Sequence, residues 1–191
     1  TIRYVAFRLF LEKGYEATNI RDICKEVNIK APSLYFYYKS KQELFYSIYD
    51  DIWNEKIAWS KRTVEAKKDI TSDMKLYHLY KNRMEYYAQN IVKQKFLMRY
   101  LLFPPEELTL SIREKYKYWS NQEHKTLLDI ISQSLDCKAM KCFQGYEDYL
   151  EKYMRFESLQ VIEMIISNIK ISDAEIDACW SRFWNSTMLR C

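Results

Sequence analysis

Apolar residues recur along nearly the whole chain at intervals of three and four positions, the spacing of helices that bury one face. In the first segment this stripe consists of Ile2, Val5, Ala6, Leu9 and Phe10. The sequence therefore predicts an all-α fold of about nine helices.

Residues that start and end helices divide the first fifty positions into short pieces. Gly14 ends the first helix, and Thr18 stands at the N-cap of a second helix, which Asn28 ends. Pro32 suits the first turn of a third helix, and Ser40 caps a fourth that runs into the low sixties. These signals predict three short helices followed by a long one.

Five further helices are expected beyond a polar boundary at residues 67–73. In order, they are a fifth helix ending near Ile91, a short sixth over 96–103, a seventh to about 134, an eighth over 146–170 after a loop at 136–145, and a ninth capped by Ser172 and Asp173. We expect two domains, residues 1–48 and residues 49–191.

Composition excludes several classes of protein. The chain has two glycines and three prolines in 191 residues, too few for the turns of a sandwich or barrel. Glycine-rich phosphate loops cannot be formed from Gly14 and Gly145 alone. Five cysteines without a C-x-x-C pair, and two distant histidines, favour reduced thiols and predict neither a metal site nor a cofactor.

No apolar run reaches the roughly 18 residues that a membrane span needs, and no signal peptide opens the chain. We therefore expect a cytoplasmic protein without a membrane partner. The sequence begins at Thr1, which leaves open whether a basic arm precedes it.

All the excess positive charge lies in the first fifth of the chain. The net charge is +4, and residues 1–41 hold eight basic and four acidic side chains, so the remainder is balanced. Such asymmetry favours a small module that meets a polyanion, joined to a neutral body.

The second and third predicted helices, joined by the tight turn Asn28–Ala31, form a helix-turn-helix pattern. The run LFLEKGYEATNIRDICKEVNIKAPSLYFYYKSKQELF, from Leu9 to Phe45, resembles the N-terminal domain of the tetracycline-repressor (TetR) family of bacterial transcription regulators. Two positions depart from the commoner pattern, Pro32 where glycine is frequent and Lys39 where proline is frequent. Beyond residue 50 the resemblance is architectural.

The resemblance implies a double-stranded, pseudo-palindromic DNA operator whose half-sites lie roughly one helical turn, about 34 Å, apart. Thr18 would cap the second helix and touch phosphate, Phe36 would set operator choice, and Lys41 would bind the DNA backbone. The implied contact residues are Thr18, Asn19, Arg21, Lys30, Ala31, Pro32, Ser33, Tyr35, Phe36, Tyr37 and Lys41. The alternative is that the tyrosines pack in the core.

The C-terminal helices are expected to pair two subunits. The eighth helix is apolar on more than one face, which favours a homodimer, although a monomer that hides these side chains is the alternative. The residues expected at the interface are Leu159, Ile162, Ile166, Ile169, Ile176, Trp180, Phe183 and Trp184.

Family resemblance also implies a small-molecule inducer in the body of the protein. The predicted lining residues are Tyr87, Phe96, Tyr100, Tyr116, Trp119, Glu123, Phe156 and Glu157. Glu123 and Glu157 fall on apolar stripes, where a carboxylate needs a partner. That partner is either an internal Arg, Lys or Tyr, or a cationic or hydrogen-bond-donating ligand held among aromatic rings.

The sequence thus predicts a ligand-responsive DNA-binding regulator, a repressor released by a small hydrophobic or cationic inducer. Two other classes compete with this prediction. One is a helical protein-interaction adaptor that keeps the fold without reading DNA. The other is an enzyme, which the sequence disfavours because it shows no metal cluster, Cys–His pair or serine-nucleophile motif.

Overall fold

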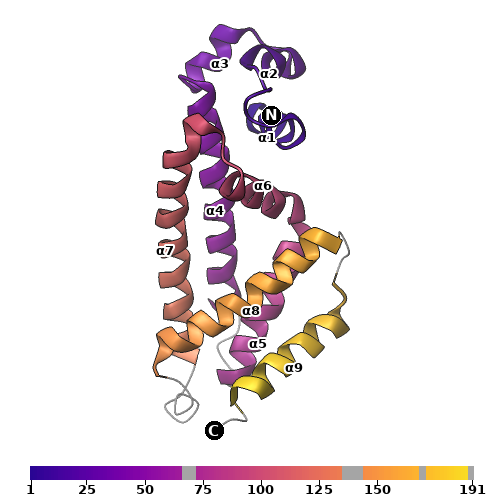
Figure 1. Cartoon of the computed structure of the whole chain (residues 1–191), viewed down its shortest axis with the longest axis vertical. Helices are drawn as coiled ribbons and strands as arrows, with labels where there is room; N and C mark the ends of the chain where they lie inside the picture. The colour runs from indigo at the N-terminus through magenta and orange to yellow at the C-terminus, as the bar shows by residue number, and fades with distance from the viewer. Residues whose placement is uncertain (66–71, 135–143, 168–170, 189–191) are drawn as a thin grey trace. The chain divides into compact units, whose positions relative to one another are not determined.

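The computed structural model describes residues 1–65, 72–134, 144–167 and 171–188. Within these ranges the chain forms nine α-helices and one short 3₁₀ helix, and no strand (Figure 1). The elements are α1 (Ile2–Lys13), α2 (Ile20–Val27), α3 (Ala31–Tyr37), α4 (Lys41–Glu65), α5 (Ser72–Gln89), α6 (Ile91–Leu102), η1 (Glu106–Leu108), α7 (Thr109–Ser134), α8 (Tyr146–Ser167) and α9 (Asp173–Met188). The predicted all-α fold is confirmed.

Local signals end and start most helices as expected. Gly14 ends α1 with φ of 87°, and a side chain there would come within 3.0 Å of the Arg99 guanidinium. Asn28 ends α2 in the left-handed region with φ of 59°. Ser40 accepts a hydrogen bond from the Glu43 backbone N–H at 3.0 Å, and Ser172 accepts one from Glu175 at 3.3 Å, so both cap a helix as predicted.

One helix differs from its predicted range. α6 begins at Ile91, not at Phe96, because Asn90 ends α5 and then accepts backbone hydrogen bonds from Lys93 and Gln94. Most of the predicted boundary at 67–73 and of the loop at 136–145 lies outside the described residues.

The chain divides into two compact units. The first comprises residues 1–54 and 96–117, and the second comprises residues 55–95 and 118–191. α4, α6 and α7 therefore contribute residues to both units. The core of the first unit surrounds Phe45, whose ring lies 5.5 Å from that of Phe10, 5.6 Å from that of Phe96 and 4.7 Å from that of Tyr100.

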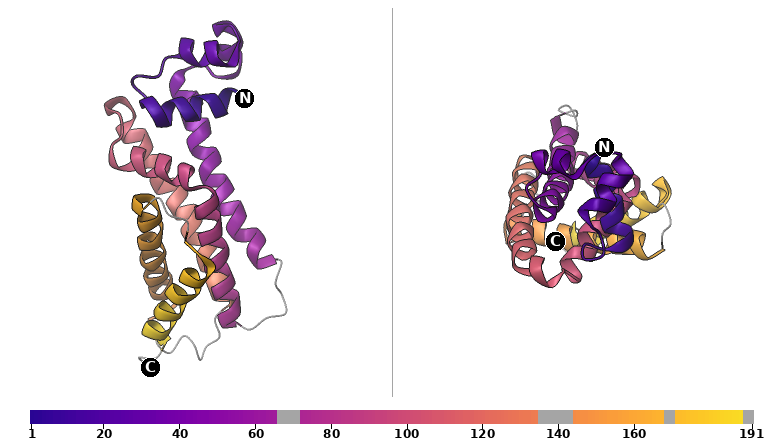
Figure 2. Two further views of the ribbon diagram at one scale, coloured as in Figure 1. Left: turned by 90° about the vertical axis from the view of Figure 1, so that its right-hand side faces the viewer. Right: turned by 90° about the horizontal axis from the view of Figure 1, so that it is seen from above.

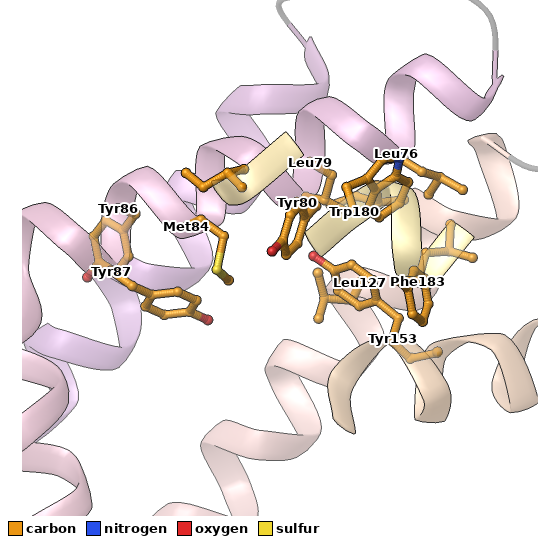
Figure 3. Packing of buried hydrophobic residues seen from close by; sticks show 14 of the residues in the cluster. Leu76, Leu79, Tyr80, Met84, Tyr86, Tyr87, Leu127, Tyr153, Trp180 and Phe183 are labelled. Atoms are coloured by element: carbon orange, nitrogen blue, oxygen red, sulfur yellow. The ribbon is translucent and has the colours of Figure 1, made fainter. Parts of the chain in front are cut away.

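The second unit is built on α5, which packs against α8 and α9 (Figure 2). Tyr80 of α5 stacks on Trp180 of α9 at 5.3 Å, and Phe183 of α9 stacks on Phe156 of α8 at 4.5 Å. Figure 3 shows Tyr80, Trp180 and Phe183 converging with Leu76, Leu79, Leu127 and Tyr153. Aromatic rings thus hold the three helices together.

Candidate nucleic-acid interface

A tight turn sets the direction of α3 relative to α2. After the left-handed Asn28, the Ile29 backbone N–H donates to the Cys24 carbonyl oxygen at 2.9 Å, and Lys30 is extended. Pro32 lies in the first turn of α3, where its missing N–H costs nothing. Leu34 is fully buried and anchors the short helix to the first unit.

The opposite side of α3 is covered by exposed aromatic side chains. Phe36 is 83% exposed, Tyr37 66% and Tyr35 48%. The Phe36 and Tyr37 rings meet edge to face, with centroids 5.2 Å apart. These exposures exclude the alternative in which the three rings pack in the core, and they leave the face of α3 available to a partner.

Thr18 contradicts the sequence prediction. The N-cap of α2 is Asn19, which makes no capping hydrogen bond through its side chain. Thr18 is fully buried, and its hydroxyl donates inward to the carbonyl oxygens of Gly14 at 2.7 Å and Leu9 at 3.2 Å. The predicted cap and phosphate contact by Thr18 are therefore wrong, because its side chain stabilises the connection between α1 and α2.

Lys41 also has an internal partner. Its ammonium donates to the Tyr15 carbonyl oxygen at 2.9 Å and lies 4.1 Å from the centroid of the Tyr15 ring. Glu16, Glu106 and Glu107 line the same hollow as Lys41 and would repel a phosphate. Lys41 thus fixes the N-terminus of α4 to the first unit, and its contact with the DNA backbone stays a prediction.

The other predicted contact residues lie at or near the surface. Asn19, Arg21, Lys30, Pro32 and Ser33 are exposed, and Ala31 is half-buried. The exposed cations at the ends of α3 are those of Lys30 and Lys39.

A buried ion cluster occupies the second unit, and its centre is Arg83 of α5, only 2% exposed. The Arg83 guanidinium lies 2.5 Å from both carboxylate oxygens of Glu157 and 2.7 Å from Oε1 of Glu123. It also donates to the hydroxyls of Ser60 and Tyr87, each at 2.6 Å. The cluster joins α4, α5, α7 and α8.

Two further groups complete the cluster. The Lys56 ammonium lies 2.9 Å from Oε1 of Glu123, and the Tyr153 hydroxyl donates to Glu157 at 2.9 Å. Two cations thus face two carboxylates, so the buried charges balance. Burial by itself would raise the pKa of Glu123, but Lys56 and Arg83 outweigh it and lower that pKa to about 2.

This arrangement settles the partner of Glu123 and Glu157. Both carboxylates bind internal cations, so the alternative of a cationic ligand as their partner is wrong. Sequence reasoning missed Arg83 and Lys56, although Arg83 was detectable: it lies three positions after Tyr80 and four before Tyr87, on the apolar face of α5.

The remaining predicted ligand residues are not gathered into one site. Phe96 and Tyr100 belong to the core of the first unit, where Tyr116 pairs with Trp53 at 6.1 Å. Phe156 belongs to the aromatic core of the second unit. Trp119, also in the second unit, packs against Tyr118 at 5.0 Å.

The predicted dimer residues fall into two sets. Leu159, Ile162 and Ile166 of α8 are 64%, 39% and 79% exposed. Ile176, Trp180 and Phe183 are buried in the core of their own unit, so their predicted role at a subunit interface is wrong. Trp184 is half-buried against Trp180, and its role at an interface stays a prediction. Ile169 lies outside the described residues.

Residues 2–48 match the model of a family described as "Bacterial regulatory proteins, tetR family". The N-terminal segment of the chain is therefore similar to the DNA-binding domain of the TetR family. The matched segment includes α1, α2, α3 and the first turns of α4, so the TetR match coincides with the helix-turn-helix described above.

Curated relatives share this TetR segment. The biofilm operon icaADBC HTH-type negative transcriptional regulator IcaR of Staphylococcus epidermidis is 45% identical over 49 residues, which cover 26% of this chain and 26% of IcaR. IcaR of Staphylococcus aureus strain Newman is 50% identical over 40 residues, or 21% of this chain and 22% of that protein. The chain thus matches about a quarter of the length of these relatives.

Solved structures resemble the fold over almost the whole chain. A TetR-like transcriptional regulator from a Rhodococcus species has a TM-score of 0.68 at 16% identity, covering 97% of this chain and 92% of that one. The TetR family regulator PfmR from Thermus thermophilus has a TM-score of 0.67 at 18% identity, covering 97% and 96%. At these identities the likeness shows the fold of a TetR protein and nothing more.

Among the described residues, no helix combines the length and apolar character that crossing a bilayer requires. The same part of the chain contains no group of three or more His, Cys, Asp or Glu side chains placed to hold a metal ion.

Proposed function

We propose that this chain is a DNA-binding transcriptional repressor that acts as a homodimer and is released from DNA by a small hydrophobic molecule. The observation that carries the proposal is the exposed face of α3. Three aromatic side chains project from a short helix that a buried leucine and a tight turn hold in place, as expected of a helix that enters the major groove.

The charge around α3 supports contact with DNA. Lys30 precedes the helix, Lys39 follows it, and Arg21 is exposed on α2. Cations at both ends of a recognition helix are suited to neutralise the phosphates on the two sides of the groove.

The relatives support repression as the sign of regulation. The IcaR proteins, which resemble this chain in the helix-turn-helix, are described as negative transcriptional regulators of a biofilm operon. Repression by occupying a promoter is therefore the mode that we propose for this chain.

A dimer is supported by the exposed apolar stripe of α8. Leu159, Ile162 and Ile166 are spaced three and four positions apart, so they lie on one face of the helix. Large side chains exposed together on one helix commonly mark an interface. Pairing of two chains would give the two-fold symmetry that a pseudo-palindromic operator matches.

An inducer site in the second unit is supported by two buried hydroxyls. Tyr80 and Tyr86 are at most 1% exposed, and among the described residues their hydroxyls have no hydrogen-bond partner. A buried unpaired hydroxyl is costly, so a mainly apolar molecule with one polar group would gain affinity by bonding to one of them. Binding there would compete with the packing of α5 against α8 and α9.

The test is binding of the full chain to the DNA upstream of its own gene, measured by fluorescence anisotropy at several salt concentrations. We expect affinity to fall steeply with salt, and Lys30→Ala to weaken binding to all sequences alike and flatten the salt slope by roughly one unit. Lys117→Ala, which removes an exposed cation from α7, is the matched control and should leave the slope unchanged. Absence of specific binding would favour the adaptor alternative.

A further inference from the structure

The side chains that α3 presents have an unusual chemistry for a DNA-reading helix. Its sequence is APSLYFY, and apart from the buried leucine it offers Pro32, Ser33 and three aromatic rings. It contains no guanidinium, ammonium, amide or carboxylate group. In the major groove, Arg and Lys read guanine, Asn and Gln read adenine, and Asp and Glu read cytosine, whereas apolar groups read the methyl of thymine.

Phe36 is the side chain best placed for such an apolar contact. It is 83% exposed, the most exposed of the large hydrophobic side chains in the described ranges. It lies two positions after the buried Leu34, about 200° around the helix, so it cannot turn into the core. The edge-to-face contact with Tyr37 restricts its ring further.

Charged side chains that could read other bases lie off α3. Arg21 belongs to α2, and Lys30 and Lys39 lie at the two ends of α3, where phosphates are expected. The central positions of a half-site would then face only methyl-reading rings and the hydroxyls of Ser33, Tyr35 and Tyr37.

We infer that the half-sites of the operator are A·T-rich where α3 meets them, and that Phe36 selects them by packing on a thymine methyl group. This inference rests on the proposed DNA-binding function and names the class of sequence that the same face recognises. Covering the exposed Phe36 ring with a methyl group removes apolar surface from water in both molecules, which favours thymine over cytosine at that position.

The experiment begins with selection of binding sites from random DNA duplexes by the full chain. Thymines of the selected half-site are then replaced one at a time by deoxyuridine, which removes the methyl group and leaves base pairing intact. At the position facing Phe36 we expect the affinity of the wild-type protein to fall about fourfold, the effect of one buried methyl group.

The variant Phe36→Ala should bind the deoxyuridine and thymine duplexes equally, because the ring that senses the methyl is gone. Phe36 is exposed, so the variant is expected to fold. Phe103→Ala, which removes a 77% exposed phenylalanine just after α6, is the matched control and should keep the fourfold difference.

Three results would overturn the inference: G·C pairs at the central positions of the selected half-sites, an affinity that no deoxyuridine substitution changes, or a deoxyuridine effect that persists in Phe36→Ala. In each case specific binding would remain, and the proposed function would stand. If no duplex is selected at all, the inference and the proposed DNA-binding function fall together.

Discussion

Neutralising Glu123 should destabilise the second unit by an amount that depends on pH. In Glu123→Gln the amide has nearly the shape of the protonated acid, so the variant isolates the value of the negative charge. Removal of that charge leaves Arg83 with Glu157 as its one anionic partner and leaves Lys56 facing an amide. The buried ion cluster would then carry a net positive charge.

The magnitude follows from the pKa. Lys56 and Arg83, acting against burial, lower the pKa of Glu123 from an ordinary 4.5 to about 2. A difference of this size corresponds to about 3 kcal/mol of stability at neutral pH. Because folding lowers the pKa, the stabilisation is complete above pH 4.5 and is lost as the pH falls toward 2. The difference in unfolding free energy between wild type and Glu123→Gln should therefore shrink to about 1–1.5 kcal/mol at pH 3.

Urea unfolding followed by circular dichroism at pH 7, 4 and 3 would measure this difference. All samples are kept at one protein concentration, because the proposed dimerisation would add to the apparent stability. Glu151→Gln is the matched control. Glu151 pairs with Arg155, their side chains are 61% and 77% exposed, and the variant should change stability by at most about 0.5 kcal/mol. The reasoning is refuted if Glu123→Gln is as stable as wild type at pH 7, or if its loss of stability is the same at pH 7 and pH 3.

Three other substitutions test separate parts of the structure. Thr18→Val should cost about 1–2 kcal/mol in thermal unfolding, since it removes a buried hydrogen bond; a variant as stable as wild type would contradict the inward role of Thr18. Phe183→Ala should cost about 3–5 kcal/mol of stability without changing the dissociation constant of the proposed dimer, and weaker dimerisation in sedimentation would contradict its place in the core. Leu159→Glu should instead give monomers with little loss of monomer stability, and an unchanged sedimentation coefficient would place the interface elsewhere.

The ends of most helices and the segment that forms the helix-turn-helix could be predicted from the sequence. Gly14, Asn28, Ser40 and Ser172 act through their own backbone conformation or through a side chain that bonds three residues away. Such signals are local, so they can be read without knowing the rest of the fold. The start of α6 differs from the prediction because Asn90 both ends α5 and precedes the first turn of α6. The apolar run that begins at Phe96 is a stronger sequence signal than this single polar residue.

The partner that each helix face and each polar group meets depends on how the whole chain folds. Periodicity marks Trp180 and Leu159 alike as apolar stripe residues, yet Trp180 packs on Tyr80 of the same chain and Leu159 is exposed. An apolar stripe predicts that a helix face is buried, but it does not show which other surface covers that face. In the same way, a carboxylate on an apolar stripe requires a cation, but the cation of Glu157 is Arg83, 74 positions away. Only the folding of α5 against α8 brings those two charges together, because nothing in the local sequence of either helix specifies the other.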